Sequence, residues 1–425
     1  MKYFLSRLVP QALKNSLYHW PLSVVATVCF GFPARKLKVI GITGTNGKTT
    51  TTQFVTRILE KAGKKVAMAS TINFQIGERR WNNASKFTTL SAWKLQKFLH
   101  DAVHAGCEYA VIETSSHALD QSRTWGIPYL IAVMTNVTRE HLDYHRTMAE
   151  YRQVKRQLFE RARMAVVNLD MEHPEEYLSA RPFEKKCSYS TAQDKADLVA
   201  TDIRESLEGS VFQVRGVACR IQLPGRYNIE NALAALGVAE LLGIDFKIAT
   251  QALSEISLVP GRMESVPNER GLSIIIDYAV TPDSLEKLYT LIRSMRPEGK
   301  KIIGVLGACG ERDRGKRPLM GKIVASQADV IILTNEDPYH EDPERIIDEI
   351  EEGVVGKEKE KNWFRIFDRR KAIAKALALA EPGDIVVVTG KGAEETMAIG
   401  DERLPWSERR VIEEELSRLG VEDLS

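Results

Sequence analysis

The sequence lacks paired cysteines and long apolar runs, and these absences exclude several classes of protein. Its five cysteines lie far apart and form no C-x-x-C pair, at positions 29, 107, 187, 219 and 309. An odd, scattered set argues against a disulfide framework or a zinc site and favours the reduced thiols of a cytosolic protein. No apolar run reaches the ~18 residues that a membrane helix needs, so no membrane span is expected.

The sequence also lacks an excess of charge of either sign. Its 59 lysines and arginines nearly balance its 57 aspartates and glutamates, which leaves a formal net charge of +2. This balance argues against a protein that binds nucleic acid by general phosphate neutralisation, although a local basic patch is compatible with it. It also excludes a disordered polyelectrolyte. At roughly 100–200 residues per domain, the 425 residues predict two to three domains.

Residues 1–36 are expected to form a short N-terminal segment. Its apolar residues lie at helical spacing and are interrupted by Pro10: Phe4, Leu5, Leu8, Leu13 and Leu17. The most apolar stretch, Pro21–Ala34, follows several basic residues, which is also a feature of signal peptides. A phosphate-binding motif comes shortly afterwards, so a packed segment is the favoured interpretation.

Apolar runs and helical periodicities alternate along the rest of the chain. In the first half they predict strands at 37–43, 65–70, 109–114 and 130–136, and helices at 48–62 and 92–105. In the second half they predict strands at 272–276, 301–306, 329–334 and 384–389, and helices at 282–295 and 343–352. Between the two halves, VPGRME at 259–264 has the proline and glycine of a boundary.

This alternation predicts an α/β fold of two domains. A P-loop domain with a doubly wound, mostly parallel sheet is expected over 37–262, and a smaller Rossmann-like α/β domain over 263–425. The charged run KEKEK at 357–361 is expected to be a solvated loop.

A phosphate-binding loop follows the first predicted strand. Its residues are Gly44, Thr45, Asn46, Gly47, Lys48, Thr49 and Thr50. Glycines let backbone N–H groups point inward, and the following helix adds its positive N-terminal end. Lys48 is expected to reach the β- and γ-phosphates of a nucleotide, and the Thr49 hydroxyl suits Mg²⁺. The loop is a variant P-loop, since Ile42 stands where the first glycine is usual; a glycine-rich turn without a ligand is the alternative.

A second candidate metal site comes from two predicted strand ends. Glu113 ends one strand, and His141 follows the strand that ends at Asn136. Ligands gather at the carboxyl ends of strands in an open α/β sheet, so Glu113 and His141 are expected to converge beside the phosphate loop. Together they could hold Mg²⁺ or Mn²⁺; a helix-capping or surface role for His141 is the alternative.

An ordered series of motifs runs from about residue 37 to 420. The motifs are GTNGKTTT at 44–51, TT at 88–89, ETSSHAL at 113–119, Gln121 with Arg123, TNVTREHLDYH at 135–145, YRQVKRQLF at 151–159, GRYNIENALAA at 225–235, PGRME at 260–264, DYAVTPDSLE at 277–286, GERDRGKRPLMG at 310–321, DPYHEDP at 337–343 and GKGAEE at 390–395. In this order they resemble the Mur ligases, which form amide bonds with ATP in peptidoglycan precursor synthesis. The closest likeness is to the MurE type, which adds the third stem-peptide residue to UDP-MurNAc-L-Ala-D-Glu.

The resemblance implies roles for individual residues. ATP would be bound by Gly44 to Thr50 together with Asn231, Arg262 and Asp277. Thr49 and Glu113 would share one Mg²⁺, and Glu113, His141 and a CO₂-carbamylated Lys155 would surround a second. The muramyl dipeptide would contact Thr88, Thr89, Ser115, Gln121 and Arg123. The incoming amino acid would contact Arg312, Glu336, Asp337, Tyr339, Gly390 and Glu394. Taken without the resemblance, Lys155 is expected on a helix surface, and the three acids of the last group are equally compatible with surface positions.

The implied reaction has two steps, with Lys48, Glu113, His141 and Lys155 as its catalytic residues. The acceptor carboxylate attacks the γ-phosphate of ATP to give an acyl phosphate and ADP, and the incoming amine then displaces phosphate. Two Mg²⁺ ions and Lys48 offset charge on the transferring group. The second domain would close over the first, with a hinge near residue 262.

The chain departs from the MurE pattern in three places. Only 36 residues precede the first strand, too few for the N-terminal domain with which these enzymes grip the UDP-sugar. The usual D-N-P-R of diaminopimelate enzymes reads Glu336-Asp337-Pro338-Tyr339, without the arginine. Two usual histidines are replaced by Val280 and Ala393, so a loss of activity is a further alternative.

The resemblance therefore implies a cytoplasmic ligase that uses a nucleotide-sugar peptide or a related carrier. It implies no nucleic-acid partner and a monomer, with a separate carrier-binding subunit as the alternative. The competing hypotheses are a related ligase, such as a folylpolyglutamate synthase, a cyanophycin synthetase or another cell-wall peptide ligase, and a nucleotide-binding scaffold without activity.

Overall fold

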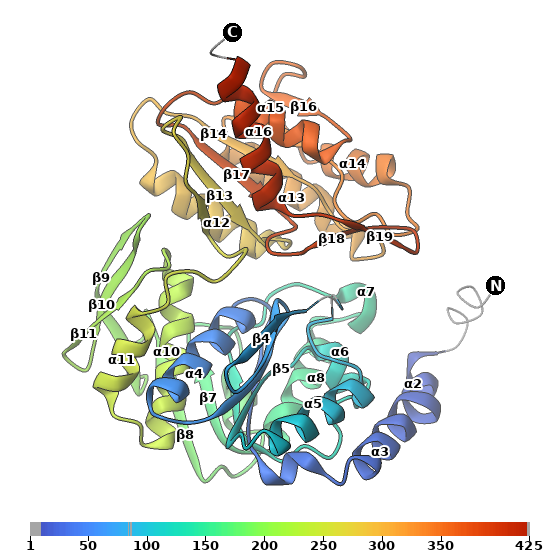
Figure 1. Ribbon diagram of the computed structural model, residues 1–425, viewed down its shortest axis with the longest axis vertical. Helices are drawn as coiled ribbons and strands as arrows, with labels where there is room; N and C mark the ends of the chain where they lie inside the picture. The colour runs from blue at the N-terminus through green and yellow to red at the C-terminus, as the bar shows by residue number, and fades with distance from the viewer. Residues whose placement is uncertain (1–9, 84, 86, 423–425) are drawn as a thin grey trace. The chain divides into compact units, whose positions relative to one another are not determined.

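The computed structural model describes residues 10–83, 85 and 87–422 (Figure 1). The chain divides into two compact units. The first unit comprises Met1–Val137, Thr147–Gln222 and Arg226–Ser257, and the second comprises Thr138–Arg146, Leu223–Gly225 and Leu258–Ser425. The short segment Thr138–Arg146 therefore clusters with the second unit, although it lies within the sequence of the first.

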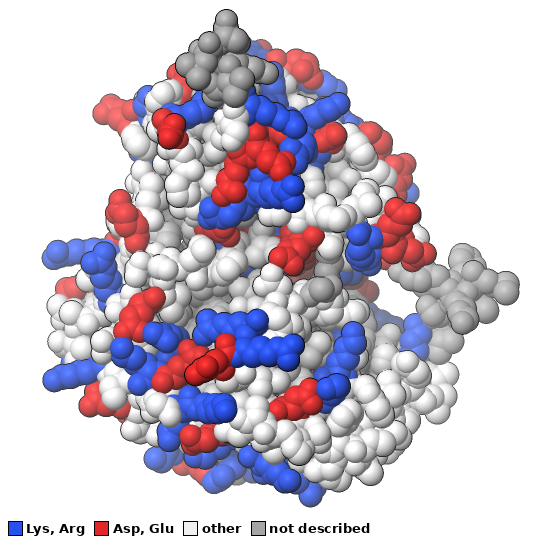
Figure 2. Space-filling model, viewed as in Figure 1, with Lys and Arg blue, Asp and Glu red and all other residues white. Residues whose placement is uncertain are grey.

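Charge is evenly mixed on the face of the molecule in Figure 2, where blue and red side chains alternate over most elements. Among the described residues, no helix combines the length and the apolar character needed to cross a membrane. All five cysteines are free thiols, in agreement with the absence of a C-x-x-C pair.

The first unit is built on one large sheet with the strand order β11-β10-β9-β8-β7-β6-β1-β5-β2-β3-β4. Neighbouring strands pair in parallel across the centre of the sheet, in the order β9-β8-β7-β6-β1-β5-β2. The strands at the two edges, β10 and β11 on one side and β3 and β4 on the other, pair antiparallel. The strands are β1 Lys38–Thr43, β2 Val66–Ala69, β3 Asn73–Ile76, β4 Arg79–Asn82, β5 Tyr109–Glu113, β6 Tyr129–Met134, β7 Ala162–Asn168, β8 Lys185–Ser190, β9 Leu198–Ser206, β10 Gly209–Val214 and β11 Val217–Ile221.

Helices cover both faces of this sheet. They are α2 Gln11–Lys14, the π-helical turn η1 Asn15–His19, α3 Trp20–Cys29, the 3₁₀ turn η2 Pro33–Lys36, α4 Lys48–Lys61, α5 Ala92–His104, α6 Ser116–Asp120, α8 Met148–Glu160, α9 Glu175–Leu178, α10 Arg226–Leu242 and α11 Phe246–Ser254. Along β7, Val166 meets α10 at Gly237, whereas Ala165 and Val167 join the core on the other face. This alternation confirms the doubly wound α/β fold that the sequence predicts.

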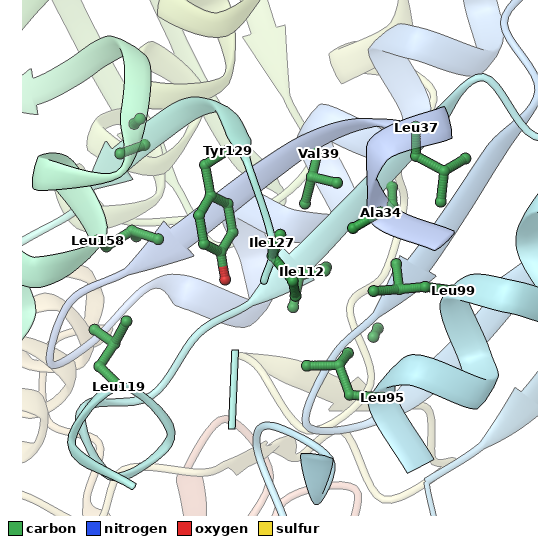
Figure 3. Close-up of a cluster of buried hydrophobic side chains, with 14 of the residues drawn as sticks. Ala34, Leu37, Val39, Leu95, Leu99, Ile112, Leu119, Ile127, Tyr129 and Leu158 are labelled. Atoms are coloured by element: carbon green, nitrogen blue, oxygen red, sulfur yellow. The ribbon is translucent and has the colours of Figure 1, made fainter. Parts of the chain in front are cut away.

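The core of the first unit lies between the sheet and α5 and α8 (Figure 3). Val39 of β1, Ile112 of β5 and Leu95 of α5 are fully or almost fully buried there. Gly41 of β1 has a packing reason, since a Cβ would lie 2.7 Å from the Tyr129 ring and 2.8 Å from Leu158. The first strand can therefore carry the phosphate loop directly on a close-packed core.

The expected N-terminal segment is helical where the structure describes it. Phe4, Leu5 and Leu8 lie outside the described residues. Ser23, Ala26 and Thr27 of α3 are buried, as expected for a packed segment, but Leu13 and Leu17 are exposed. The apolar periodicity thus predicts the helix but not which of its residues are covered.

The second unit has a smaller sheet with the order β12-β13-β17-β14-β15-β16, parallel except for β12, and a separate hairpin β18-β19. The strands are β12 Glu264–Val266, β13 Ser273–Asp277, β14 Ile302–Leu306, β15 Val330–Leu333, β16 Trp363–Arg365, β17 Ile385–Thr389, β18 Thr396–Ile399 and β19 Glu402–Pro405. The helices are α7 Leu142–His145, α12 Pro282–Met295, the 3₁₀ turn η3 Arg314–Lys316, α13 Arg317–Gln327, α14 Pro343–Glu351, α15 Arg369–Leu379 and α16 Glu408–Glu422.

The parallel strands of the second unit end at one edge of their sheet, which places the loops after β13, β14, β15 and β17 together. These loops contain most of the residues expected to meet the amino acid. The run at 357–361 forms turns outside the sheet with four exposed residues, while Lys357 donates to the carbonyl oxygens of Ala328 and Asp329. The expectation of a solvated loop is right except at its first residue.

Candidate active site

The phosphate loop connects β1 to α4, and at two of its positions there is no room for a side chain. Gly44 and Gly47 have φ of 152° and 81°. A Cβ on Gly44 would lie 1.9 Å from the Thr135 Oγ1, and one on Gly47 would lie 2.1 Å from the Asn231 Oδ1. Both glycines are therefore required by positive φ and by close approach.

Residues after β6 fix the loop from one side. The Thr45 N–H donates to the Asn136 carbonyl oxygen at 2.8 Å, and the Asn46 N–H donates to the Asn136 Oδ1 at 2.9 Å. The Thr135 hydroxyl donates to the Asn46 carbonyl oxygen at 2.6 Å. The motif TNVTREHLDYH thus begins by holding the loop in its curled form.

Two lysines meet at the carbonyl oxygen of Gly44. The Lys155 Nζ donates to it at 2.8 Å, and the Lys48 Nζ donates to it at 3.2 Å and to the Thr45 carbonyl oxygen at 2.7 Å. Lys155 is 1% exposed. Burial, and then the charge of Lys48, hold the pKa of Lys155 well below its usual value.

The expectation that Lys155 lies on a helix surface is therefore wrong. Its burial follows from its place on α8, where Tyr151, Lys155 and Leu158 share one face at the helical spacing and all three are buried. The motif YRQVKRQLF contains this spacing, so the sequence does carry a signal that Lys155 is buried.

Glu113 lies at the end of β5 and is 1% exposed. Its Oε2 accepts from the Thr49 hydroxyl at 3.1 Å and from the Thr71 N–H at 2.8 Å, and its Oε1 accepts from the Thr71 hydroxyl at 2.8 Å. Thr71 was missed from the sequence, although it follows the neighbouring parallel strand β2 and so lies at the same sheet edge.

Thr49 and Glu113 offer the hard oxygen donors that Mg²⁺ prefers. Among the residues that the structure describes, no three histidine, cysteine, aspartate or glutamate side chains lie close enough to hold a metal ion. His141 lies in the segment that clusters with the second unit, directly before α7 with φ of 57°, and its Nδ1 lies 4.0 Å from the Glu140 Oε1.

A second group of polar residues adjoins Glu113. The Thr89 hydroxyl donates to the Glu113 carbonyl oxygen at 2.9 Å and accepts from the Ser115 N–H at 2.9 Å. The Arg123 Nη1 donates to the Thr89 carbonyl oxygen at 3.1 Å, and its guanidinium also binds the Gln121 Oε1. Four of the five residues expected to hold the dipeptide thus form one hydrogen-bonded cluster.

The remaining two residues expected near ligands in the first unit are Thr88 and Asn231. Thr88 precedes Thr89 in the chain and is half-buried. Asn231 of α10 is buried against Gly47 and its Oδ1 accepts from the Thr51 hydroxyl at 3.3 Å. Asn231 therefore lies at the start of α4, next to the phosphate loop.

In the second unit, Arg262 and Asp277 lie together at the end of β13. The Arg262 guanidinium stacks on the Tyr278 ring, 4.5 Å from its centroid. The Asp277 Oδ2 accepts from the Met263 N–H at 2.8 Å. Burial raises the pKa of Asp277 and the charge of Arg262 opposes the shift.

Tyr278 joins this pair to a buried cluster of charges. Its hydroxyl donates to the Glu394 Oε1 at 3.3 Å. The Lys391 Nζ donates to both oxygens of Asp337 at 2.9 Å and to the Glu394 Oε2 at 2.5 Å. Burial opposes the charge of Lys391, but the carboxylates of Glu394 and Asp337 hold its pKa above the usual value. No role is predicted from the sequence for Tyr278 or Lys391. Tyr278 directly follows the last residue of β13, and Lys391 follows Gly390, the first residue after β17.

Glu336 lies beside this cluster and is 4% exposed. Its Oε2 has no hydrogen-bond partner among the described residues, and burial raises its pKa to about 7. A Cβ on Gly390 would lie 2.5 Å from that oxygen, so glycine is needed there. The surface interpretation of Glu336 and Asp337 is wrong, while Glu394 is partly exposed.

Arg312 and Tyr339 lie at the more open side of the same loops. The Arg312 guanidinium is 5.8 Å from the centroid of the Tyr339 ring and is exposed. Arg403 approaches the same ring at 5.1 Å. Tyr339 has φ of 52° and its backbone pairs with Ala398 and Gly400 of the β18 hairpin. The cationic side chains of Arg312 and Arg403 thus lie beside Tyr339, which stands where diaminopimelate enzymes usually have an arginine.

Comparisons with known proteins agree with the motifs. The Mur ligase middle domain family matches residues 42–239, and the Mur ligase glutamate ligase domain family matches residues 261–392. A UDP-N-acetylmuramyl-tripeptide synthetase of Roseiflexus sp. is 40% identical over 420 residues, covering 94% of this chain and 82% of that protein. A UDP-N-acetylmuramoyl-L-alanyl-D-glutamate–2,6-diaminopimelate ligase of Nostoc sp. is 40% identical, covering 91% of this chain and 78% of that protein.

Solved structures show the same relationship. The structure of a UDP-N-acetylmuramoyl-L-alanyl-D-glutamate–2,6-diaminopimelate ligase superposes with a TM-score of 0.62 and 33% identity, over 90% of this chain and 79% of that one. A folylpolyglutamate synthase of Mycobacterium tuberculosis shares the fold, with a TM-score of 0.71 at 18% identity over 92% and 94% of the two chains. Together with the family matches, these relatives show that the chain belongs to the Mur ligase family of ATP-dependent, ADP-forming ligases, and to its MurE-like members.

Proposed function

We propose that this ligase joins an amino acid to the D-glutamate of a UDP-MurNAc-L-Ala-D-Glu acceptor or a close analogue. The relatives at 33–40% identity are named for that acceptor or for the tripeptide product. Among the solved structures compared, the alternatives within the same fold, including folylpolyglutamate synthases, have 20% identity or less. The MurE type is therefore the favoured specificity.

The arrangement around Glu113 carries this proposal. Its carboxylate binds Thr49 of the phosphate loop, while its backbone oxygen binds Thr89 of the cluster that contains Arg123. Glu113 thus contacts both the phosphate loop and the cluster that presents the Arg123 guanidinium. An acceptor carboxylate held by Arg123 would lie beside the γ-phosphate of ATP held at Lys48 and Thr49, as acyl phosphate formation requires.

The reaction balances as two displacements. A carboxylate oxygen of the acceptor bonds to the γ-phosphorus, the bond to the ADP oxygen breaks, and ADP leaves. The amine nitrogen then bonds to the carbonyl carbon, phosphate leaves, and the amine gives up a proton. Lys48 offsets the charge on the transferring phosphoryl group. Magnesium bound by Thr49 and Glu113 would supply further charge stabilisation of the phosphates.

Lys155 fits the proposed carbamylation. Two ammonium groups on one carbonyl oxygen would repel each other, and burial further disfavours the charge on Lys155. A neutral amine can bond to the carbon of CO₂ and lose a proton, which yields a carbamate. That anion would lie beside Lys48 and would attract it instead.

The loops of the second unit are proposed to bind the amino acid through its α-carboxylate at Arg312. Glu336, Asp337 and Glu394 surround one lysine, so acid is in excess in this cluster by one charge even when Glu336, whose pKa is raised to about 7, is protonated. The cluster therefore suits a distal ammonium group, and Tyr339 lacks the bidentate charge that a distal carboxylate needs. We expect a diamino acid with a single carboxylate, such as L-lysine or L-ornithine.

A substrate screen tests the proposal. Phosphate release would be measured with ATP, Mg²⁺ and UDP-MurNAc-L-Ala-D-Glu against a panel of amino acids, with product mass as the second readout. Release that depends on both the acceptor and one amino acid supports the proposal. Release that needs a folyl-glutamate acceptor instead would favour the related ligases, and ATP binding with no acceptor-dependent release would favour the scaffold.

A further inference from the structure

The segment that precedes the first strand presents an apolar surface to solvent. Six large apolar side chains of α2, η1 and α3 are between 47% and 71% exposed: Leu13, Leu17, Tyr18, Trp20, Val25 and Val28. They come from a stretch of only nineteen residues, Gln11–Cys29. Surface apolar residues are ordinary when scattered, but a contiguous group of this kind marks a binding face.

The inner side of this segment is firmly packed, so its exposed side is not a loosened core. The rings of Phe30 and Trp93 meet edge to face at 5.2 Å. The Thr27 hydroxyl donates to the Trp125 carbonyl oxygen at 3.3 Å. The helix is thus held in one orientation, with a fixed apolar face outward.

The charges within this segment have one sign, and an acid beside it is Asp120, whose Oδ2 accepts from the Asn15 side-chain amide at 2.8 Å. No aspartate or glutamate occurs before Glu60, whereas residues 1–36 contain five basic residues, Lys2, Arg7, Lys14, Arg35 and Lys36. From Asn15 to Ala34 there is no charged residue at all. In Figure 2 the surface over α2 and α3, at the lower right, is accordingly almost entirely white. An uncharged helix flanked by cations contrasts with the near-neutral balance of the whole chain.

We propose that this face docks on the surface of a bilayer that contains anionic phospholipid. A helix lying in the interface buries its apolar side about 5–10 Å into the headgroup and acyl boundary. Tryptophan and tyrosine are favoured at that depth, since one end of each ring system is apolar and the other can bind water. Flanking lysines and arginines gain attraction from negatively charged headgroups.

A second copy of the chain fits this face less well. A two-fold interface would set the same surface against itself, and the basic residues Lys14, Arg35 and Lys36 of one copy would then be brought toward those of the other. Protein interfaces also carry a polar rim with many hydrogen bonds, and the exposed side of α3 offers mainly aliphatic side chains.

The test uses the full chain and sedimentation with vesicles of phosphatidylcholine, with and without phosphatidylglycerol. We expect binding to the anionic vesicles that weakens at high salt and is accompanied by a blue shift of tryptophan emission. The double variant Leu17→Glu with Val28→Glu should bind at least about tenfold more weakly. Val355→Glu, at an exposed valine of the second unit, is the matched control and should bind as the unchanged protein does.

Two further measurements keep the outcome clear. Circular dichroism and acceptor-dependent phosphate release should be unchanged in the double variant, because neither residue lies in the candidate site. Absence of vesicle binding, or binding that the double variant retains in full, would overturn the proposal. A dimer in light scattering that the double variant dissolves, without vesicle binding, would overturn it in favour of a second copy.

Discussion

Lys155 of the first unit and Lys391 of the second are both buried, yet their surroundings are opposite. Lys155 meets a carbonyl oxygen and a second cation, whereas Lys391 meets two carboxylates. Burial alone disfavours an ammonium ion in both places. The partners decide the result: the pKa of Lys155 is lowered and that of Lys391 is raised. The lowered pKa of Lys155 is compatible with the proposed carbamylation, whereas Lys391 neutralises acid.

This difference matches what each unit has to bind. The proposed phosphate site of the first unit is lined by backbone N–H groups and lysines, and the proposed carbamate of Lys155 would add an anion there. The second unit gathers the carboxyl groups of Glu336, Asp337 and Glu394, and among the described residues the Glu336 Oε2 has no hydrogen-bond partner. The two proposed sites would therefore be complementary in charge, one suited to ATP and the other to an ammonium-bearing amino acid.

The largest effect is expected from replacing Lys48, the lysine of the phosphate loop whose positive charge the reaction needs. Lys48→Ala should lower kcat/KM by about a thousandfold or more, because Lys48 offsets charge that develops on the γ-phosphate. Steady-state phosphate release would measure the change, with Lys94→Ala, an exposed lysine on α5, as the control. Near-normal turnover of Lys48→Ala would contradict the assignment of the phosphate loop.

Lys155→Ala should be nearly inactive, with a loss of about a hundredfold or more, and small carboxylates such as acetate should partly restore turnover. The reason is that the proposed carbamate supplies an anionic oxygen that acetate can replace. Intact-protein mass spectra under CO₂ would detect the modification directly. If Lys155 stays unmodified and its alanine variant stays fully active, the carbamate role is wrong.

Replacing each buried lysine by methionine compares the two sites as parts of the fold. Lys391→Met would leave Asp337 and Glu394 buried without their cation, so the second unit should lose about 3–5 kcal/mol of stability. Lys155→Met would remove only an amine that is already poorly charged and should cost much less. Urea unfolding at pH 7.5 would measure both, and equal losses would contradict the inferred charge states.

The phosphate loop and the order of strands could be predicted because they depend on local patterns. Gly44, Gly47 and Lys48 lie in one short motif, and apolar runs mark the parallel strands. The partners of Glu113 and Lys391 could not be predicted in this way, because Thr71 reaches Glu113, and Asp337 reaches Lys391, from other loops at the same sheet edge. Of the site residues, Lys155 was misjudged because a lysine in a helix is usually solvated, and only its spacing from Tyr151 and Leu158 indicates burial.

Glu336→Gln should change the pH dependence of stability. Burial raises the pKa of Glu336 from 4.5 to about 7, so the folded state binds a proton that the unfolded state has lost. Stability from this group is present below pH 4.5 and is lost as the pH rises through about 7. The variant should therefore be more stable than the unchanged protein at pH 8, by up to about 3 kcal/mol, and similar at pH 4.5. Calorimetry at both values would check this, and an equal difference at the two would contradict it.

The smallest expected effect concerns the choice of amino acid at Tyr339. The acids nearby attract a distal ammonium group of the incoming amino acid. A distal carboxylate would meet only the neutral hydroxyl of Tyr339 and the two arginines that lie against its ring, Arg312 and Arg403. Tyr339→Arg adds a guanidinium that can bind a carboxylate in two places. Competition between L-lysine and meso-diaminopimelate should favour lysine in the unchanged protein and shift toward diaminopimelate by about tenfold in the variant, a difference of about 1.4 kcal/mol. Tyr339→Phe is the control, since it removes the hydroxyl without adding charge and should leave the ratio nearly unchanged. A higher kcat/KM for diaminopimelate in the unchanged protein would show that another cation, with Arg403 as the nearest candidate beside Tyr339, already receives the distal carboxylate.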